Sequence, residues 1–238
     1  MTAVLVLWDI DHTLVNAGGA GTDLYAGVYR DLFGSELPGV PPMAGRTDRA
    51  IVLDTLRGAG VGEAESYVDA FLAGLAARAD SFRLAVARCG RALPGAAAAL
   101  SALALHSPAP LQSVLTGNVR PVAEVKLGTL GLTAHLDLDI GAYGDHHAVR
   151  AELVHLARRQ AALAYGRDFA GPATVVVGDT PLDVAAARAA GARSVGVATG
   201  AASIADLARA GASAVLPSLT DTAAVLAAVI GDGARSDL

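Results

Sequence analysis

Carboxylates follow a run of apolar residues near the start of this chain. The stretch VLVLWDIDHT, residues 4–13, has the pattern of a buried strand that stops at Asp9, and a second acid, Asp11, follows two positions later. Two carboxylates so close together at the end of a buried strand are costly unless something binds them. The spacing therefore directs attention to nucleophilic, proton-transfer and metal-binding chemistry.

Two further apolar runs end in residues that can do chemistry. The run SVLTGN ends with the hydroxyl of Thr116, and the run VVVGDTPLD ends with the carboxyl of Asp179. Ligands of a parallel sheet bind beyond the carboxyl ends of its strands. We therefore expect an acid, a hydroxyl and a second acid to converge on one crevice.

Short β-rich runs alternate with Ala-rich helical runs over most of the chain. We expect strands at 3–9, 111–116, 136–140, 173–178, 193–198 and 213–216. We expect helices near 95–106, 119–130, 148–165, 181–191, 203–211 and 220–230. Strands that are apolar throughout, such as TVVVGD, are typical of a parallel sheet covered on both faces. The alternation predicts a doubly wound α/β fold with right-handed crossovers.

Residues 15–93 interrupt this alternation, because no convincing strand is visible in them. They predict helices near 19–34, 46–58 and 63–89, with a Pro/Gly-rich break at LPGVPPMAG. Such a block suggests a small all-helical second domain inserted after the first strand, with hinges near 16–19 and 93–95. The expected division is a core of residues 1–15 and 93–238 and a cap of residues 16–92.

Composition limits the classes of protein to consider. The chain has 238 residues, of which 53% are hydrophobic and 17% charged, so we expect a globular protein with a large core. A net charge of −5 argues against nucleic acid or an anionic membrane as the main partner. Cys89 is the only cysteine, which excludes an internal disulfide and a Cys-rich metal site. We expect a cytoplasmic enzyme, and the sequence does not indicate its oligomeric state.

The three motifs together resemble those of a known family. DIDHT, an apolar run ending in Thr116 and then GDTPLD are similar to the motifs of the haloacid dehalogenase-like (HAD) hydrolase superfamily. The core resemblance covers roughly residues 1–15 and 93–230, which implies a Rossmann-like core. The helical block resembles the cap of the phosphoglycolate phosphatase and β-phosphoglucomutase branch. These motifs are specific for the superfamily and say little about the substrate.

The resemblance implies roles for the acids. Asp9 is the expected nucleophile, which would form an aspartyl-phosphate, and Asp11 the expected general acid and base. Asp9, the backbone carbonyl of Asp11, Asp179 and Asp183 are the expected oxygen-rich ligands of Mg²⁺. For Asp183 a second interpretation stays open, because Thr180 as N-cap and Asp183 at the third helical position also make a good helix start without any function.

The resemblance also implies a phosphate-binding group. Thr116, with the backbone N–H groups of Gly117 and Asn118, would hold the phosphoryl oxygens at a helix start. The alternative is that Thr116 or Asn118 only caps that helix. The family further needs a cation near the nucleophile, and the candidates are Lys126 and Arg150.

The sequence does not decide which of the two cations lies near the nucleophile. Lys126, the only lysine, lies eight residues beyond Asn118. That is ~12 Å along a regular helix, or ~7.5 Å if the helix starts at Pro121. Arg150 lies near the start of the helix before the fourth strand, where the family's cation usually enters, and the geometry slightly favours it. Either residue could instead be a surface or helix-pairing charge.

Two residues at the mouth of the site have alternative interpretations. Arg46, in AGRTDRA at the start of a cap helix, could reach the substrate, or Thr47 or Asp48 could cap the helix and leave Arg46 exposed. His12 stands where relatives usually carry Gly in a tight turn that tolerates positive φ. It is either a tolerated substitution in that turn or a residue that touches the leaving group between core and cap.

The sequence therefore predicts a Mg²⁺-dependent phosphatase that acts on a small phosphorylated metabolite, with no nucleic-acid or membrane partner. A β-phosphoglucomutase-like phosphotransferase and a non-catalytic HAD-fold binding protein are the alternatives. Asp11 argues against a dehalogenase, whose reaction has no alcohol leaving group to protonate. The absence of lysine from residues 15–93 argues against a phosphonate hydrolase, and a binding protein would be expected to lack Asp9 or Asp179.

Overall fold

A five-stranded parallel sheet forms the centre of the computed structural model, which describes residues 4–231. In spatial order its strands are β4 (Leu111–Val114), β1 (Leu5–Trp8), β5 (Thr174–Gly178), β6 (Arg193–Val197) and β7 (Ala214–Leu216). All neighbouring strands pair in parallel. Because β1 lies between β4 and β5, the carboxyl ends of these three strands share one edge, as the motifs predict.

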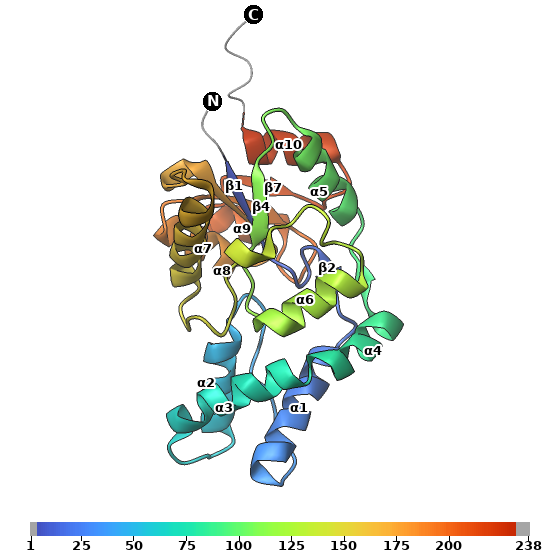
Figure 1. The fold of residues 1–238 in the computed structure, drawn as a ribbon, viewed down its shortest axis with the longest axis vertical. Coiled ribbons are helices and arrows are strands. Elements are labelled where there is room, and N and C mark those ends of the chain that lie inside the picture. Colours follow the sequence, from blue (N-terminus) through green and yellow to red (C-terminus); the bar gives the residue numbers. More distant parts are fainter. Residues whose placement is uncertain (1–3, 232–238) are drawn as a thin grey trace, which may run out of the picture.

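Helices cover both faces of the sheet, so the predicted doubly wound fold is confirmed (Figure 1). They are α5 (Ala96–Leu105), α6 (Arg120–Thr129), α7 (Arg150–Tyr165), α8 (Pro181–Ala189), α9 (Ile204–Arg209) and α10 (Thr222–Ile230). Val6 and Trp8 pack into a hydrophobic cluster with α5, α6 and α10. Leu5 and Leu7 pack into another cluster with α7 and α8. This division explains why β1 is apolar throughout, since successive side chains of a strand point to opposite faces.

Four helices form the predicted helical cap at one end of the molecule, away from both termini (Figure 1). They are α1 (Ala20–Phe33), α2 (Asp48–Gly58), α3 (Ala64–Ala77) and α4 (Ala79–Cys89). Their buried side chains, including Tyr25 and Phe71, form a hydrophobic cluster of their own. Val122 and Val125 of α6 belong to the same cluster. Helix α6 therefore contacts both the sheet and the cap.

A short antiparallel ribbon joins the two chain segments that enter and leave the cap. It pairs β2 (Val15–Asn16) with β3 (Arg91–Ala92). The expectation that residues 15–93 contain no strand is wrong at both ends of that range. Two residues per strand are too few to produce a recognisable apolar alternation. The ribbon adjoins the predicted hinges at 16–19 and 93–95, which themselves stay a prediction.

The strand expected at 136–140 is also wrong. Residues Leu138–Ile140 form a 3-10 helix, η1. Asp137 Oδ1 accepts a hydrogen bond from the backbone N–H of Asp139 at 3.0 Å. A side chain that bonds its own backbone in this way favours a turn over a strand, although the alternation HLDLDI imitates one. The sheet consequently has five described strands where six are expected.

The long cap helix expected at 63–89 is divided in two. It breaks at Arg78, between α3 and α4, where no Gly or Pro marks the break. The Arg78 guanidinium pairs with Asp31 of α1. The other expected elements are present, with ends that differ by a few residues, and residue 3 of the first expected strand lies outside the described residues. A second 3-10 helix, η2 (Gly171–Ala173), precedes β5.

Candidate active site

The predicted acids Asp9 and Asp179 come together at the strand ends, but the third expected group, the hydroxyl of Thr116, does not line their crevice. Asp9 follows β1, Thr116 follows β4 and Asp179 follows β5, and all three side chains are buried. Thr13 Oγ1 lies 3.2 Å from Asp9 Oδ2 and 3.4 Å from Asp179 Oδ1, so one hydroxyl connects the two acids. Thr13 stands in the DIDHT motif but carries no distinct signal of its own in the sequence.

Asp9, Asp179 and Asp183 form a buried acidic cluster. Each offers one carboxylate oxygen, and these oxygens lie within 4.8 Å of one another. Asp183 Oδ2 accepts hydrogen bonds from Thr180 N at 3.0 Å and Thr180 Oγ1 at 2.6 Å, as part of a capping box at the start of α8. The helix-start interpretation of Asp183 is therefore confirmed. Its Oδ1 lies 2.7 Å from Arg150 Nη2, and its role as a metal ligand stays a prediction.

Arg150 is the cation of this cluster. Its Nη2 lies 2.7 Å from Asp9 Oδ1 and 2.7 Å from Asp183 Oδ1, and it donates to the backbone oxygen of Leu115 at 3.1 Å. Burial would lower the pKa of this guanidinium, but Asp183 and Asp9 outweigh burial and raise it. Arg150 is therefore charged and buried, and it is not a surface charge.

The electrostatics of the cluster fit a divalent cation. Burial raises the pKa of Asp9 well above its ordinary value, and Asp183 raises it further. Burial, again assisted by Asp183, raises the pKa of Asp179 to about 7. Within residues 4–231, Asp183 Oδ1 has no hydrogen-bond donor, although Arg150 lies close to it. A set of oxygen ligands whose ionised forms repel one another is the donor set that a hard dication stabilises.

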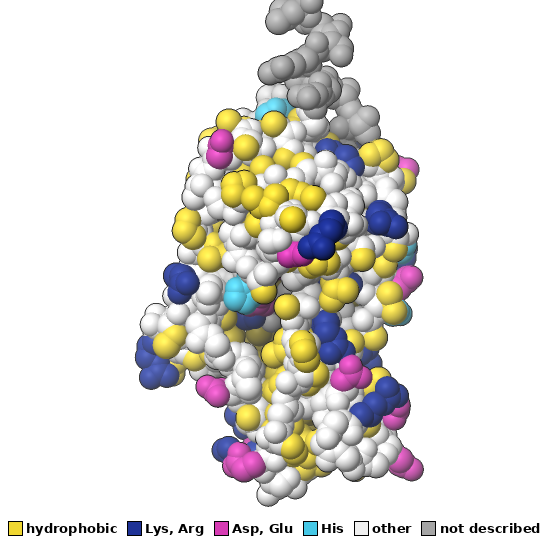
Figure 2. Space-filling model, turned by 180° about the vertical axis from the view of Figure 1, so that it is seen from behind, with side chains coloured by type: hydrophobic (Ala, Val, Ile, Leu, Met, Phe, Trp, Pro, Cys, Tyr) yellow, Lys and Arg dark blue, Asp and Glu magenta, His cyan; other side chains and the backbone are white. Residues whose placement is uncertain are grey.

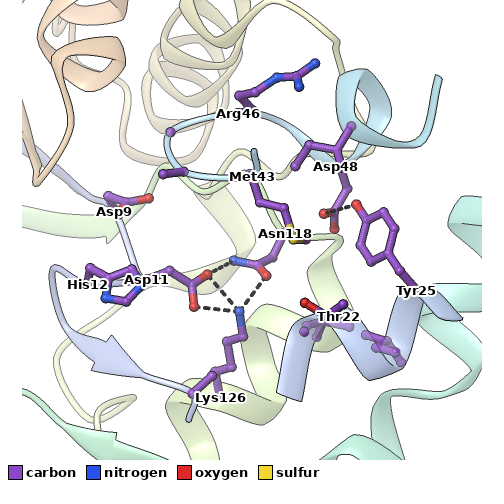
Figure 3. Close-up of a pocket in the computed structure, with 18 of the residues that line it drawn as sticks. Asp9, Asp11, His12, Thr22, Tyr25, Met43, Arg46, Asp48, Asn118 and Lys126 are labelled. Carbon is purple, nitrogen blue, oxygen red and sulfur yellow. Dashed lines mark hydrogen bonds and ion pairs between the residues drawn. The ribbon is translucent and has the colours of Figure 1, made fainter. Parts of the chain in front are cut away.

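Asp11 has the opposite surroundings from Asp9 (Figure 3). Lys126 Nζ lies 2.7 Å from both carboxylate oxygens of Asp11, and Asn118 Nδ2 donates to Asp11 Oδ2 at 2.7 Å. Lys126 also donates to Asn118 Oδ1 at 2.7 Å. Burial alone would raise the pKa of Asp11, but Lys126 and Asn118 outweigh it and lower that pKa.

Both candidate cations thus lie in the site. Helix α6 begins at Arg120, and Lys126 Nζ reaches Asp11, so its position along the helix does not prevent contact. Lys126 is 5% exposed and Arg150 is 7% exposed, which excludes surface roles for both. Arg150 contacts Asp9, and Lys126 contacts Asp11.

The loop after β4 is tightly packed. Thr116 Oγ1 accepts hydrogen bonds from Asn118 N at 3.2 Å and from Asn118 Nδ2 at 2.7 Å. The N-cap of α6 is Val119, with no side-chain cap, so neither Thr116 nor Asn118 caps the helix. At Gly117, a Cβ atom would lie 1.9 Å from the backbone oxygen of Arg46, which explains the need for glycine.

Backbone hydrogen bonds attach the start of α2 to the core loops. Asp48 N donates to Gly117 O at 2.7 Å, and Arg49 N donates to Gly144 O at 3.1 Å. Thr47 Oγ1 donates to Ala148 O at 3.0 Å. These contacts hold the cap against the loop after β4, over the strand ends.

The cap and core enclose a cavity of about 300 Å³, and Figure 2 shows a hollow where the two lobes meet. Its lining includes Asp9, Asp11, His12, Gly117, Asn118, Lys126, Arg150 and Asp179 from the core, and Thr22, Tyr25, Met43, Arg46, Asp48 and Phe82 from the cap. Most of the predicted site residues therefore surround one space. Thr116 is not part of the cavity wall, and its hydroxyl oxygen instead accepts hydrogen bonds from Asn118.

Asp48 is an acid of the cap side that the sequence analysis considers only as a helix cap. Its Oδ1 accepts a hydrogen bond from Tyr25 Oη at 2.7 Å, and its Oδ2 accepts one from Val119 N at 2.8 Å. Burial raises its pKa to about 6, although these two donors act in the opposite direction. Tyr25 and Val119 are distant in sequence from Asp48, so no local pattern indicates this site.

The guanidinium of Arg46 is held outside the centre of the site. Its Nη2 lies 2.5 Å from Asp54 Oδ2, and Figure 3 shows it pointing away from Asp9 and Asp11. Thr47 caps α2 by accepting from Ala50 N at 3.3 Å, as the alternative interpretation expects. A direct contact between Arg46 and a substrate stays a prediction.

His12 adopts the conformation expected of the turn. Its φ is 60°, in the left-handed region that glycine adopts most readily. Its carbonyl accepts a hydrogen bond from Thr199 Oγ1 at 2.6 Å, and its N–H donates to Val15 O at 2.7 Å. Its side chain also lines the cavity, so the structure keeps both interpretations of this residue.

A parallel Rossmann-like sheet, a helical cap inserted after its first strand and buried acids at the strand ends define a class of capped α/β hydrolases. The family model described as haloacid dehalogenase-like hydrolase matches residues 6–188, and the chain belongs to this family. The protein is accordingly an enzyme of the hydrolase class. Within the described part of the chain, no helix has both the length and the apolar character needed to cross a membrane.

Solved structures with the same fold cover nearly the whole chain. A proposed β-phosphoglucomutase from Bacteroides vulgatus is 18% identical, with a TM-score of 0.63, and the match covers 96% of this chain and 90% of that one. A predicted phosphatase from Clostridium acetobutylicum is 18% identical, with a TM-score of 0.62 and coverages of 95% and 99%. A proposed phosphoglycolate phosphatase from Lactobacillus plantarum is 17% identical, with a TM-score of 0.63 and coverages of 94% and 100%. No curated protein matches the sequence.

Proposed function

We propose that this protein is a Mg²⁺-dependent phosphatase that hydrolyses a small phosphomonoester through an aspartyl-phosphate on Asp9. The observation that carries the proposal is the position of Asp9. This buried acid contacts the cation Arg150 and shares a cluster with the acids Asp179 and Asp183, on the wall of the cavity between cap and core. Membership of the hydrolase family and the small size of the cavity also support it.

In the first step, an Asp9 carboxylate oxygen bonds to phosphorus, and the bond between phosphorus and the alcohol oxygen breaks. Asp11 gives a proton to the departing alcohol oxygen. In the second step, Asp11 accepts a proton from water as the water oxygen attacks phosphorus. The bond to Asp9 then breaks, and inorganic phosphate leaves.

Asp9, Asp179 and Asp183, with the backbone carbonyl of Asp11, are the groups proposed to hold Mg²⁺. The bound ion would neutralise charge on the phosphoryl oxygens and keep Asp9 ionised. Arg150 would keep the nucleophile oriented through its 2.7 Å contact with Asp9 Oδ1.

Lys126 controls the proton on Asp11 in this proposal. Lys126 and Asn118 lower the pKa of Asp11, which suits its role as a base in the second step. For Asp11 to carry a proton in the first step, Lys126 must turn to another anion. The phosphoryl group, held near Gly117 and Asn118, is that anion, so substrate binding itself would free Asp11 to act as an acid.

Phosphate release from an aryl phosphate tests this proposal. The purified protein should release inorganic phosphate when Mg²⁺ is present, because Mg²⁺ compensates the buried acids and the phosphoryl charge. EDTA should abolish the release, and excess Mg²⁺ should restore it. Release that is unaffected by EDTA would contradict the proposed metal dependence.

A further inference from the structure

The cations that line the cavity are all paired with acids, whereas two of the lining acids are not paired with a cation. Each of its three cations is held by an acid: Arg46 by Asp54, Lys126 by Asp11, and Arg150 by Asp9 and Asp183. Two lining acids, Asp48 and Asp179, form no direct ion pair with any of these cations. Asp179 belongs to the proposed Mg²⁺ site. Asp48 is therefore the acid of the cap side that has hydrogen-bond donors but no direct ion pair, and Lys126 acts on it only from a greater distance.

The cap offers no other charge to a substrate. Besides Arg46 and Asp48, its side of the lining consists of neutral residues such as Thr22, Tyr25 and Phe82. Tyr25 donates its hydroxyl hydrogen to Asp48 Oδ1, so this hydrogen is not available to a substrate. Each Asp48 oxygen accepts one hydrogen bond in the structure and can accept a second. Because Arg46 is paired with Asp54, the described cap lining presents hydrogen-bond acceptors and no unpaired cation.

This arrangement determines which leaving groups are compatible with the site. A carboxylate on the alcohol portion of a substrate would lie in one cavity with Asp48 and with the phosphoryl group, and like charges repel more strongly where protein replaces water. A hydroxyl or ammonium group would instead donate to Asp48. An ammonium group would also reduce the net negative charge of the loaded site.

We propose that the substrate is a phosphomonoester of a neutral or amino alcohol, that phosphorylated hydroxy acids are disfavoured, and that Asp48 is the residue that makes this selection. The inference rests on the proposed phosphatase function. It contrasts with the substrate in the name of the Lactobacillus plantarum structure, which is a phosphorylated hydroxy acid.

Three two-carbon phosphomonoesters test the selection, because they differ only in the terminal group: 2-aminoethyl phosphate, 2-hydroxyethyl phosphate and 2-phosphoglycolate. The expected kcat/KM for the first two is at least about tenfold higher than for 2-phosphoglycolate. Equal values, or a preference for 2-phosphoglycolate, would overturn the selection. An aryl phosphate measured in parallel keeps the two proposals apart, because its hydrolysis upholds the phosphatase function whatever the order of the three esters.

An Asp48→Asn variant tests the residue. It should reduce the ratio of kcat/KM for 2-aminoethyl phosphate to that for 2-phosphoglycolate by about tenfold or more. This ratio is internal to each enzyme, so a general loss of activity does not change it. Asp80→Asn makes the same substitution at an exposed cap position outside the cavity, and should leave the ratio at its wild-type value.

An unchanged ratio in Asp48→Asn would overturn the role of Asp48. If this variant does not fold, as judged by circular dichroism, the wild-type ester series still decides the substrate class. Tyr25→Phe then tests the position of Asp48, because it removes the phenol that holds Oδ1. It should change the same ratio, and an unchanged ratio would count against Asp48.

Discussion

At the scale of residues, Asp9 and Asp11 are two positions apart and yet have opposite surroundings. Asp9 is enclosed with other acids, and burial raises its pKa, whereas Lys126 and Asn118 lower the pKa of Asp11. Groups whose environments differ in this way are suited to different roles in one reaction. The separation of roles depends on Lys126, which contacts Asp11 and not Asp9.

Lys126→Met tests this dependence. The substitution removes the cation that holds Asp11 ionised, so the pKa of Asp11 should rise, and kcat/KM for an aryl phosphate should fall about 100-fold. The pH dependence of kcat/KM is the measurement. Its basic limb, where Asp11 loses the proton that the first step requires, should move to higher pH. Arg83→Met, at an exposed cap arginine paired with Asp80, is the control and should change neither quantity. A Lys126→Met enzyme with the wild-type profile would contradict the account.

The sequence indicates the acids and the loop after β4, because they follow apolar runs. It also indicates the two candidate cations, of which Lys126 is the only lysine. It does not indicate Thr13, Tyr25 or Asp48 as a site. The Asp48 contacts join residues 23 and 71 positions apart, and no short pattern reports such distances. The uncertainty between Lys126 and Arg150 has the same origin, because both residues turn out to be buried in one cavity.

At the scale of elements, the start of α2 and the loop after β4 act as one unit. Asp48 N, through Gly117 O, and Asp48 Oδ2, through Val119 N, connect the cap to the residues that flank Asn118. The sequence predicts both elements but not their contact. It also predicts a strand at 136–140, where the side chain of Asp137 stabilises a turn. Local propensity is therefore informative about elements and uninformative about how the cap is attached.

Gly117→Ala tests this attachment. The new Cβ would lie 1.9 Å from the backbone oxygen of Arg46, so the cap loop has to move away from the core. Activity on an aryl phosphate should fall at least about tenfold, because small displacements in a catalytic site are costly. Gly128→Ala is the control, since its Cβ meets open space in α6. It should retain full activity and stability within about 1 kcal/mol of wild type. Equal activity in the two variants would show that the close approach at Gly117 is unimportant.

At the scale of the whole molecule, the burial of acids makes stability depend on pH and on metal. Asp48 and Asp179 have pKa values of about 6 and about 7 in the folded protein, above the value of 3.8 expected for an exposed Asp. At pH values between 3.8 and these raised pKa values, Asp48 and Asp179 are protonated in the folded state and ionised in the unfolded state. The free energy of unfolding of the metal-free protein should therefore decrease as pH rises from about 4 to about 7.

Thermal unfolding with and without Mg²⁺ measures this effect. The Tm of the metal-free protein should decrease over this pH range, and Asp48 alone contributes up to about 3 kcal/mol to the change. Mg²⁺ should raise Tm more at pH 7 than at pH 5, because it binds the ionised acids. Asp48→Asn should make the decrease shallower. A metal-free Tm that increases from pH 4 to pH 7, or that Mg²⁺ does not change, would contradict this description of the site.

The central claim is that Asp9 carries the phosphoryl group during turnover. The direct measurement is mass spectrometry of the peptide that contains Asp9, after the enzyme is quenched with acid while it hydrolyses an aryl phosphate with Mg²⁺. We predict a phosphoryl group on Asp9 and, in the Asp9→Asn variant, neither this group nor activity. A phosphoryl group on another residue, or full activity in Asp9→Asn, would contradict the account.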